Sequence, residues 1–444
     1  MKAVFLSAAP VWHASMGELS TLLRSELARA GYADVRSFDL TTAKLAFCQG
    51  EFDCWVKTPG RCRAEDTETE IVAAVHDADA LVLLGPVTFG GHGYVLKRAI
   101  DRLLCLLEPF FTKRASLTHH TRRYDRYPSL FSVGWAPEPS LSVAETFDEL
   151  NDANAINFFA PRRGALVADD ANRERWCEAI RTMFDHPRAP GATLTSRESL
   201  RAALLSSAAP DPHGVGPVHT GRAAILVGSS KPKGTSASEA LARALGERLE
   251  RASVAAEYHF ATEFVHDDAR AAAQAKSIAA CDLFVLATPL YVDSLPALAT
   301  HALELVLRAR EGAPPPGRFI AMVNCGFPEA EHNRTALRIA RHFAEQARYA
   351  WAGGLALGGG GVVKRHRSLE RPHAPVASIV RALDRAAPAL ARGDAIPIEA
   401  IASMAEAPIP EVLYRVIADL GFRFQAYQNR VSQHGLHAHP LDSR

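Results

Sequence analysis

The sequence predicts an α/β protein made of two tandem, doubly wound parallel sheets with five strands each. Short, uniformly apolar strands alternate with amphipathic helices, which is typical of parallel sheets that helices cover on both faces. The same order of strands and helices occurs a second time after residue 221. At 444 residues, the chain also exceeds the size that one hydrophobic core usually serves.

The first copy begins with an apolar strand over residues 2–7 and an amphipathic helix over residues 17–30 that closes at Gly31. A second apolar strand is predicted over residues 78–86, and a helix over residues 94–110 follows it. Each strand thus leads into a helix, which is the connection that neighbouring parallel strands require.

The second copy repeats this order. Its strands are predicted over residues 222–230 and 281–289, and its helices over residues 236–251 and 296–310. The chain therefore contains one architecture twice, and the second copy can supply the first with a dimer-like partner. We expect this intramolecular pseudo-dimer either to be the whole assembly or to associate again as a homo-oligomer.

The repeat also sets the expected domain boundaries. We expect a first domain over residues 1–184, a linker over residues 185–220 and a second domain over residues 221–444. The linker is rich in Pro, Ser, Gly and Ala, with one short helical run. The second domain should end in a helical tail whose last, polar residues are solvated.

The composition excludes several classes of partner. A net charge of +1 leaves no excess of either sign to hold nucleic acid or an anionic membrane. Charged residues interrupt every long apolar run, so no segment is expected to cross a bilayer. Seven cysteines, an odd number spread over a long chain, suit a reducing compartment. We therefore expect a cytoplasmic protein that binds neither nucleic acid nor membranes.

Ligands of open α/β sheets bind at the carboxyl ends of the strands. In the second copy, the loop after the first strand joins glycines and hydroxyls to a helix N-terminus, which is typical of a phosphate-binding loop. An ordinary Ser/Thr-rich helix cap is the alternative. The candidate residues are Ser229, Ser230, Lys231, Gly234, Thr235 and Ser236.

Two further loops of the second copy would border a planar ring. The loop after the third strand presents an aromatic ring and polar groups, and the fourth strand ends in a polar, glycine-containing segment. The glycine run 358–361 after the fifth strand permits close approach of the backbone, although such a run can also be a simple turn. The candidate residues are Pro289, Leu290, Tyr291, Val292, Asp293, Asn324, Cys325, Gly326 and Phe327.

The phosphate loop followed by TPLYVDSLP and VNCGFPEA resembles the flavodoxin-like NAD(P)H-dependent FMN reductase superfamily. In the first copy, CWVKTPGRC followed by GPVTFGGHGYVLKRAIDRL is similar to the branch of iron–sulfur flavoproteins and related NAD(P)H-dependent oxidoreductases. The resemblance implies two flavodoxin-like domains, a non-covalent FMN and NAD(P)H as co-substrate.

The first copy departs from this pattern, because its first loop has few hydroxyls and carries the bulky Trp12. The resemblance therefore makes the second copy the more secure flavin site. In the first copy, a glycine loop beside His92 and the segment SVGWAPEP, residues 132–139, remain available to a ring. The candidate residues there are Ser7, Ser15, Pro86, Val87, Thr88, Phe89, Gly90 and Gly91.

Three cysteines lie within an insertion of the first copy. From Val4 to Val82 the first and third strands are 78 residues apart, against 58 from Leu226 to Phe284. This 20-residue excess is about the size of the segment CQGEFDCWVKTPGRC.

In cluster-bearing relatives the pattern is C-x2-C-x2-C with a fourth cysteine beyond. Here Cys48, Cys54 and Cys62 take the first, third and fourth places, and Glu51 takes the second. Because a [4Fe–4S] cluster normally needs four thiolates, we favour a structural loop over an iron–sulfur cluster, with zinc or a reactive thiol as a further alternative.

The remaining cysteines and one histidine pair carry weaker signals. Cys105, Cys177 and Cys281 are predicted as small core residues, and Cys325 as a packing or redox residue at the flavin edge. The adjacent His119 and His120 point opposite ways on an extended chain, so we expect a loop at the rim of the site and no metal pair. Arg122 and Arg123 beside them are expected on a solvated face, with a nicotinamide phosphate as the alternative partner.

The resemblance implies an FMN-dependent NAD(P)H oxidoreductase that passes electrons to a quinone, a nitro compound or another small acceptor. Flavin chemistry needs no catalytic side chain from the protein, so none is assigned. Two alternatives stay open. One is an electron-transfer protein, like an iron–sulfur flavoprotein, without pyridine-nucleotide activity, and the other is a chain in which one copy is a flavin-free scaffold.

Overall fold

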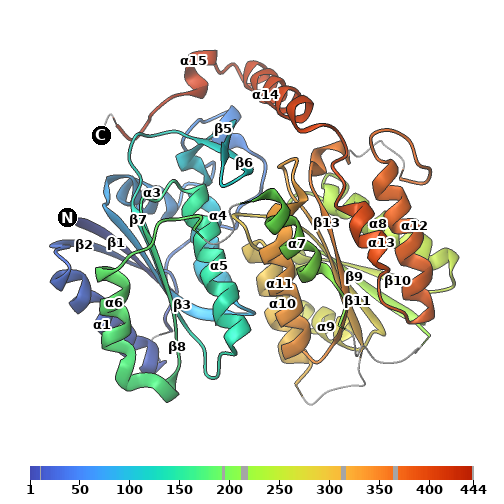
Figure 1. Cartoon of the computed structure of the whole chain (residues 1–444), viewed down its shortest axis with the longest axis horizontal. Helices are drawn as coiled ribbons and strands as arrows, with labels where there is room; N and C mark the ends of the chain where they lie inside the picture. Colours follow the sequence, from blue (N-terminus) through green and yellow to red (C-terminus); the bar gives the residue numbers. More distant parts are fainter. Residues whose placement is uncertain (11, 193–195, 212–218, 312–316, 364–368, 443–444) are drawn as a thin grey trace. The chain divides into compact units, whose positions relative to one another are not determined.

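The computed structural model describes residues 1–10, 12–192, 196–211, 219–311, 317–363 and 369–442. The chain forms two compact units, which are coloured by sequence in Figure 1. Unit 1 comprises Met1–Thr195 and Val416–Arg444, and unit 2 comprises Ser196–Arg415.

Unit 1 is built on a parallel sheet with the strand order β2-β1-β3-β7-β8. This 2-1-3-4-5 order is that of flavodoxin-like folds, and it confirms the fold class for the first copy. The short β4 (Gly91–His92) adds antiparallel to the end of β3. The five strands are β1 (Lys2–Ser7), β2 (Asp34–Asp39), β3 (Ala80–Thr88), β7 (Ser129–Trp135) and β8 (Arg163–Ala168).

Helices cover both faces of this sheet. Alternate strand residues such as Phe131 and Val133 pack with helices α1 (Ala14–Arg29) and α6 (Trp176–Asp185) in one apolar core. Ser132 points to the opposite face, where Asn151 of α5 (Leu141–Asn157) donates a hydrogen bond to its hydroxyl at 2.8 Å. The unit also contains α2 (Asp53–Val56), α3 (Glu68–Asp77), α4 (Tyr94–Arg102) and the 3-10 helices η1 (Leu103–Leu106) and η2 (Asp170–Arg175).

The predicted helix over residues 94–110 was wrong in its second half. Helix α4 ends at Arg102, and the chain continues as η1 and as a hairpin of β5 (Leu107–Arg114) and β6 (Leu117–Arg122). Pro109 explains the difference, because proline lacks the N–H of a helix interior and disfavours helical geometry in the residue before it.

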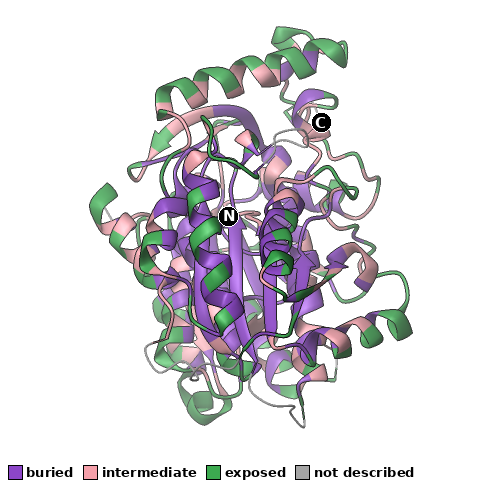
Figure 2. Ribbon diagram, turned by 90° about the vertical axis from the view of Figure 1, so that its right-hand side faces the viewer, coloured by how far each residue is buried: buried purple, intermediate pink, exposed green. Residues whose placement is uncertain are grey.

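Unit 2 repeats the architecture with the strand order β10-β9-β11-β12-β13, all parallel, so the fold class is confirmed for the second copy as well. Figure 2 shows strands that are largely buried and helices whose outer surfaces are exposed. The strands are β9 (Arg222–Val227), β10 (Ala255–Phe260), β11 (Leu283–Pro289), β12 (Arg318–Asn324) and β13 (Ala350–Leu357).

The helices of unit 2 are α7 (Arg197–Ala208), α8 (Ala237–Arg251), α9 (Asp268–Ala279), α10 (Ala297–Ala309), α11 (Arg334–Gln346), α12 (Ala377–Arg392) and α13 (Ile398–Met404). Three short 3-10 helices join them: η3 (Ala261–Phe264), η4 (Ala330–Asn333) and η5 (Gly360–Val362). Helix α7 is the helical run of the expected linker, and it packs on α11. Residues 193–195 and 212–218 of that linker lie outside the described residues.

The C-terminal tail belongs to unit 1, which corrects the expected second domain over residues 221–444. Helix α14 (Glu411–Gln428) crosses the boundary between the units, and α15 (Gln433–Leu436) follows it. Ala426 and Leu436 are buried in a core cluster with Trp55 and Phe110 of the first copy. Arg123 adds hydrogen bonds to the carbonyls of Leu436 and Ala438. These contacts, which sequence periodicity does not report, place the tail on unit 1.

Candidate functional site

In unit 1, the N-terminus of α1 lies at the carboxyl end of β1, where the phosphate site is expected. His13 is the N-cap residue, with extended backbone and no side-chain hydrogen bond to the helix end. Within the described residues, the first turn of α1 contains no acidic side chain. The first turn therefore supplies no capping carboxylate of its own, although Asp170, from elsewhere in the unit, hydrogen-bonds the side chain of Ser15 in this turn.

The predicted hydroxyls of unit 1 flank this helix end. The hydroxyl of Ser7 accepts the N–H of Ala9 at 3.3 Å. The buried Ser15 hydrogen-bonds Asp170, and this contact, together with the indole N–H of Trp135, lowers the pKa of the Asp170 carboxyl. Trp135 in turn packs edge-on against His13, with 4.1 Å between the ring centroids. The segment 132–139 thus brings an indole next to the phosphate position.

Both copies carry the same tight turn after the third strand of the sheet. In unit 1, Thr88 pairs with Gly91 across Phe89 and Gly90, which have φ of 56° and 81°. In unit 2 the same kind of turn closes with a bridge from residue 291 to residue 294, and Val292 and Asp293 have φ of 45° and 57°. Positive φ at two central residues is typical of a type I′ turn.

Left-handed backbone is costly for Phe89 and especially for the β-branched Val292. Strained backbone of this kind concentrates at ligand sites. The turns therefore support a functional role for the third-strand loops of both copies. Of the predicted residues, Pro86 and Thr88 are half-buried at the strand end, whereas Phe89 is buried.

Two other residues of this loop have structural roles. A Cβ at Gly134 would lie 2.3 Å from Val87, so the half-buried Val87 side chain packs over Gly134. His92 is buried in β4, where burial and the charge of Lys97 lower its pKa to about 3. His92 is therefore neutral at physiological pH.

The phosphate-binding loop of unit 2 uses its donors internally. Ser236 caps α8 by accepting the N–H of Glu239 at 3.1 Å. The buried carboxylate of Glu239 accepts the N–H of Gly234 and pairs with Arg243 at 2.9 Å. Ser236 thus acts as an ordinary N-cap residue, whereas Glu239 accepts the N–H of Gly234.

The other polar groups of this loop are also engaged. Ser229 and Ser230 are buried, and the Ser229 hydroxyl accepts the N–H of Lys231 at 3.3 Å. The Thr235 hydroxyl donates to the carbonyl of Pro232 at 2.6 Å. The carboxylate of Glu239, which is paired with Arg243, thus holds the N–H of Gly234 that a phosphate would otherwise use.

The fourth-strand loop of unit 2 is closed by its own chain. Asn324 accepts a hydrogen bond from Ser238 at 2.7 Å, and the backbone N–H of Leu290 donates to the Asn324 carbonyl at 2.8 Å. The Tyr414 hydroxyl donates to the carbonyl of Gly326 at 2.7 Å. Burial raises the pKa of the Cys325 thiol to about 12, so Cys325 is a neutral packing residue.

The glycine run after β13 serves this closed packing. A Cβ at Gly358 would lie 2.4 Å from the carbonyl oxygen of Pro328, and one at Gly359 would lie 3.2 Å from the Tyr414 ring. Gly359 also has a φ of 64°, and its N–H donates to the carbonyl of Phe327 at 2.5 Å. The glycines thus permit the chain to pass close to itself at this point.

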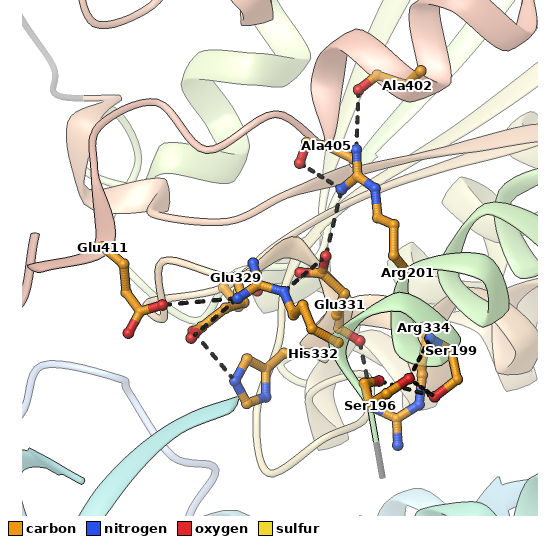
Figure 3. Close-up of polar contacts among 12 residues, drawn as sticks. Ser196, Ser199, Arg201, Glu329, Glu331, His332, Arg334, Ala402, Ala405 and Glu411 are labelled. Carbon is orange, nitrogen blue, oxygen red and sulfur yellow. Dashed lines mark hydrogen bonds and ion pairs between the residues drawn. The ribbon is translucent and has the colours of Figure 1, made fainter. Parts of the chain in front are cut away.

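Two buried carboxylates follow this loop, and sequence reasoning missed them. Arg197 of α7 lies 3.2 Å from Glu331, 3.8 Å from Glu329 and 3.8 Å from Glu411. The three carboxylates are labelled in Figure 3. Arg201, one turn later, lies 3.7 Å from Glu331 and donates to two backbone carbonyls at the end of α13. The i, i+4 arginines of the expected linker are the sequence signal that could have indicated this clamp.

The three loop cysteines of unit 1 line one pocket of about 290 Å³ together with Asp101 and Arg102. Burial, followed by the charge of Asp101, raises the pKa of Cys48 to about 12. Burial and the neighbouring thiols also raise the pKa of Cys54. Thiols that stay protonated are poor nucleophiles. Within the described residues, no group of three or more His, Cys, Asp or Glu side chains is arranged to hold a metal ion.

Helix α4 clamps the cysteine insertion to the unit. Arg98 donates to the carbonyl of Leu45 at 3.1 Å, and Arg102 pairs with Asp66 at 2.5 Å and donates to the carbonyl of Ala64 at 3.2 Å. Trp55 inserts into the core and donates its indole N–H to the carbonyl of Leu107 at 3.0 Å. These contacts support the structural interpretation of the loop.

The histidine pair lies on strand β6. Nδ1 of His119 is 2.7 Å from the side-chain oxygen of Asn157, whereas His120 contacts the carbonyl of Pro109 and the ring of Trp55. The two rings thus have different partners, as expected for an extended chain. Arg123 is buried, which corrects its expected place on a solvated face: its guanidinium satisfies backbone carbonyls, including that of Leu107 at 3.2 Å.

Comparison with known proteins identifies related chains. The family model described as NADPH-dependent FMN reductase matches residues 1–121 and 222–350, which is more than half of the chain. An iron–sulfur flavoprotein from Archaeoglobus fulgidus is 28% identical over 104 residues, which are 23% of this chain and 46% of the relative. The chain thus spans about half the length of this curated relative.

Similar solved structures cover about two fifths of this chain. One is an NAD(P)H:quinone oxidoreductase from Methanothermobacter marburgensis, with 17% identity, a TM-score of 0.34 and coverage of 42% of this chain and 98% of that one. Another is an azoreductase from Bacillus anthracis, with 14% identity, a TM-score of 0.29 and coverage of 39% and 99%. In the part of this chain that the structure describes, no helix is both long and apolar enough to span a bilayer.

Proposed function

Because the chain belongs to the NADPH-dependent FMN reductase family, we propose that it is an FMN-dependent oxidoreductase that takes electrons from NAD(P)H. The acceptor is a small molecule such as a quinone or a nitro compound. The observation that carries the proposal is the family match in both copies, each of which ends its third strand in a strained turn. When bound, FMN supplies hydride acceptance and electron transfer.

We propose that the FMN phosphate binds at the N-terminus of α1 in unit 1. The first-turn N–H groups point toward the carboxyl edge of the sheet, and no acidic side chain stands among the described residues of that turn. Ser7 and Ser15 add hydroxyls at the same helix end. In unit 2, Glu239 already takes the N–H of Gly234, so this copy serves as a flavin-free partner.

The turn from Thr88 to Gly91 and the indole of Trp135 would border the ring. These groups position a ring and limit water on one side. His92 lies next to this turn but stays neutral, since its pKa is about 3, so it does not deliver a proton at neutral pH. The chain's contribution is therefore binding and orientation. Because all seven cysteines are unpaired, a reducing compartment such as the cytoplasm suits the protein.

One observation favours a second candidate function. Cys48, Cys54 and Cys62 line a single pocket, as ligands of a cluster would, and the curated relative is an iron–sulfur flavoprotein. The protein would then be an electron carrier without pyridine-nucleotide activity. Iron and sulfide analysis of anaerobically purified protein distinguishes the two candidates.

The proposal is tested with the full chain, reconstituted with FMN and assayed anaerobically for oxidation of NADH and NADPH. A quinone, a nitroarene and an azo dye serve as acceptors. We expect acceptor-dependent oxidation that requires bound FMN. An FMN-loaded protein that oxidises neither nucleotide with any acceptor would exclude the oxidoreductase function and favour the electron carrier.

A further inference from the structure

Helix α14 exposes its most apolar face to solvent. Seven large apolar side chains of this helix are between 49% and 76% exposed: Val412, Leu413, Val416, Ile417, Leu420, Phe424 and Tyr427. Figure 2 shows this helix, at the top, as largely exposed or intermediate. A contiguous apolar surface of this kind on a globular protein marks an interaction site.

The inner face of the same helix is fixed in unit 1. Ala426 is fully buried, and Phe422 packs against Trp55, with 5.7 Å between the ring centroids. Phe422 also contacts Phe52 and Phe111 edge-on, each with 6.3 Å between ring centroids. Because these anchors set the rotation of the helix, the apolar face has to point outward from unit 1.

The exposed residues follow the spacing of a coiled-coil seam. Ile417, Leu420, Phe424 and Tyr427 are separated by three, four and three residues, and Leu413 precedes Ile417 by four. Apolar residues at alternating spacings of three and four align along one helix face and pack against a second helix. The surface is thus shaped for a helix.

We propose that this face binds the same face of a second copy of the chain, with the two α14 helices antiparallel. The spacing of three, four and three reads the same in both directions, and a two-fold interface requires a surface that matches itself. In this pairing Ile417 lies opposite the copy's Tyr427, and Leu420 lies opposite the copy's Phe424.

The charged residues of α14 favour a second copy of the chain as the molecule that binds the apolar face. Within the helix, Glu411 and Asp419 balance Arg415 and Arg423, whereas helices that lie on membranes are rich in Lys and Arg on their polar face. Arg423, which flanks the seam, lies 4.8 Å from the Phe110 ring centroid and hydrogen-bonds Gln433, so it is held toward unit 1. A net charge of +1 gives two copies little mutual repulsion.

The test is sedimentation velocity of the full chain over a concentration series. We expect a dimer of about twice 48.0 kDa. Leu420→Lys and Phe424→Glu, which alter exposed side chains, should each raise the dimer dissociation constant at least tenfold. The double variant L420K/F424E should restore much of the dimer, because residue 420 then faces the opposite charge at residue 424 of the other copy. Val412→Glu, at an exposed apolar position that precedes the seam residues Leu413, Ile417, Leu420, Phe424 and Tyr427, should leave the dimer unchanged.

A monomeric wild-type chain at all concentrations would overturn the proposal. So would a dimer that Leu420→Lys leaves intact, since another surface would then hold it. Monomeric protein that sediments with neutral or anionic vesicles, and loses this with Leu420→Lys, would assign the face to a lipid surface instead. Restored dimer in the double variant is the result that a misfolded single variant cannot imitate.

Discussion

The carboxylate of Glu239 accepts a hydrogen bond from the backbone N–H of Gly234, inside the loop of unit 2 that sequence pattern assigns to phosphate. The corresponding helix end in unit 1 has no such carboxylate among its described first-turn residues. The two copies thus differ in the group that a carboxylate holds at this helix end: the backbone N–H of Gly234 in unit 2 and the side chain of Ser15 in unit 1.

Neutralising Glu239 should open the second copy to phosphate. We expect Glu239→Gln to raise the FMN bound per chain above the wild-type value, because the carboxamide removes the negative charge from the loop. The measurement is a fluorescence titration with FMN. Glu247→Gln, on the exposed side of the same helix, is the matched control, and equal stoichiometry in Glu239→Gln and wild type would show that this carboxylate does not exclude the ligand.

A carboxylate placed on α1 should have the opposite effect. Ala14 is exposed at the first position of the helix, so Ala14→Asp should stabilise the helix by about 0.5 kcal/mol while it repels a phosphate. We expect at least a tenfold weaker affinity for FMN with no loss of thermal stability. Thr21→Asp, exposed further along α1, is the control. Unchanged affinity of Ala14→Asp for FMN would show that the FMN phosphate does not bind at this helix end.

Glu68 should make unit 1 less stable as the pH rises. Burial raises the pKa of Glu68 to about 7, against the opposing charge of Arg102. Below an unfolded pKa near 4.5 both states hold the proton, whereas between pH 4.5 and about 7 the unfolded state ionises while the folded state keeps its proton, so stability falls over this window. The free energy of unfolding of Glu68→Gln, measured relative to that of wild type, should therefore be roughly 2–3 kcal/mol higher at pH 8 than at pH 4.5.

The measurement for Glu68 is urea unfolding of both proteins across this pH range. Glu70→Gln, on the exposed side of the same helix, should follow the wild-type profile. A Glu68→Gln profile parallel to wild type from pH 4.5 to 8 would contradict the assigned pKa.

The clamp between α7 and the β12 loop should stabilise unit 2. Arg201→Met removes an ion pair to the buried Glu331 and should cost about 2 kcal/mol, less than for a fully buried pair because Arg201 is partly exposed and Arg197 also contacts Glu331. In a Glu331→Gln background, Arg201→Met should lower the free energy of unfolding by less. Chemical denaturation of wild type, the two single variants and the double variant completes a double-mutant cycle. An equal loss of unfolding free energy from Arg201→Met in both backgrounds would refute the coupling between Arg201 and Glu331.

Much of the fold follows from the sequence, because buried parallel strands read as uniform apolar runs. The helix expected over residues 236–251 is observed as Ala237–Arg251, and the strand expected over residues 281–289 is observed as Leu283–Pro289. The error at residues 94–110 arose where an apolar run continued through Pro109 into a strand. Periodicity alone does not distinguish such a strand from a helix.

The site was less predictable, because its outcome depends on tertiary contacts. The spacing of Ser236 and Glu239 is visible in the sequence, but the sequence does not say whether the N–H of Gly234 serves a carboxylate or a phosphate. Likewise, nothing local to Ala426 indicates that it packs against Trp55 of the first copy. Long-range packing decides the burial of Ala426, whereas the contact of Gly234 with Glu239 spans only five residues.

The decisive experiment quantifies FMN and iron per chain in one anaerobically purified, FMN-reconstituted sample. We expect one FMN per chain and iron well below one per chain. Absence of flavin absorbance would contradict the FMN site itself. Two FMN per chain would contradict the closed second copy, and iron near four per chain with a broad brown absorbance would contradict the structural role of Cys48, Cys54 and Cys62.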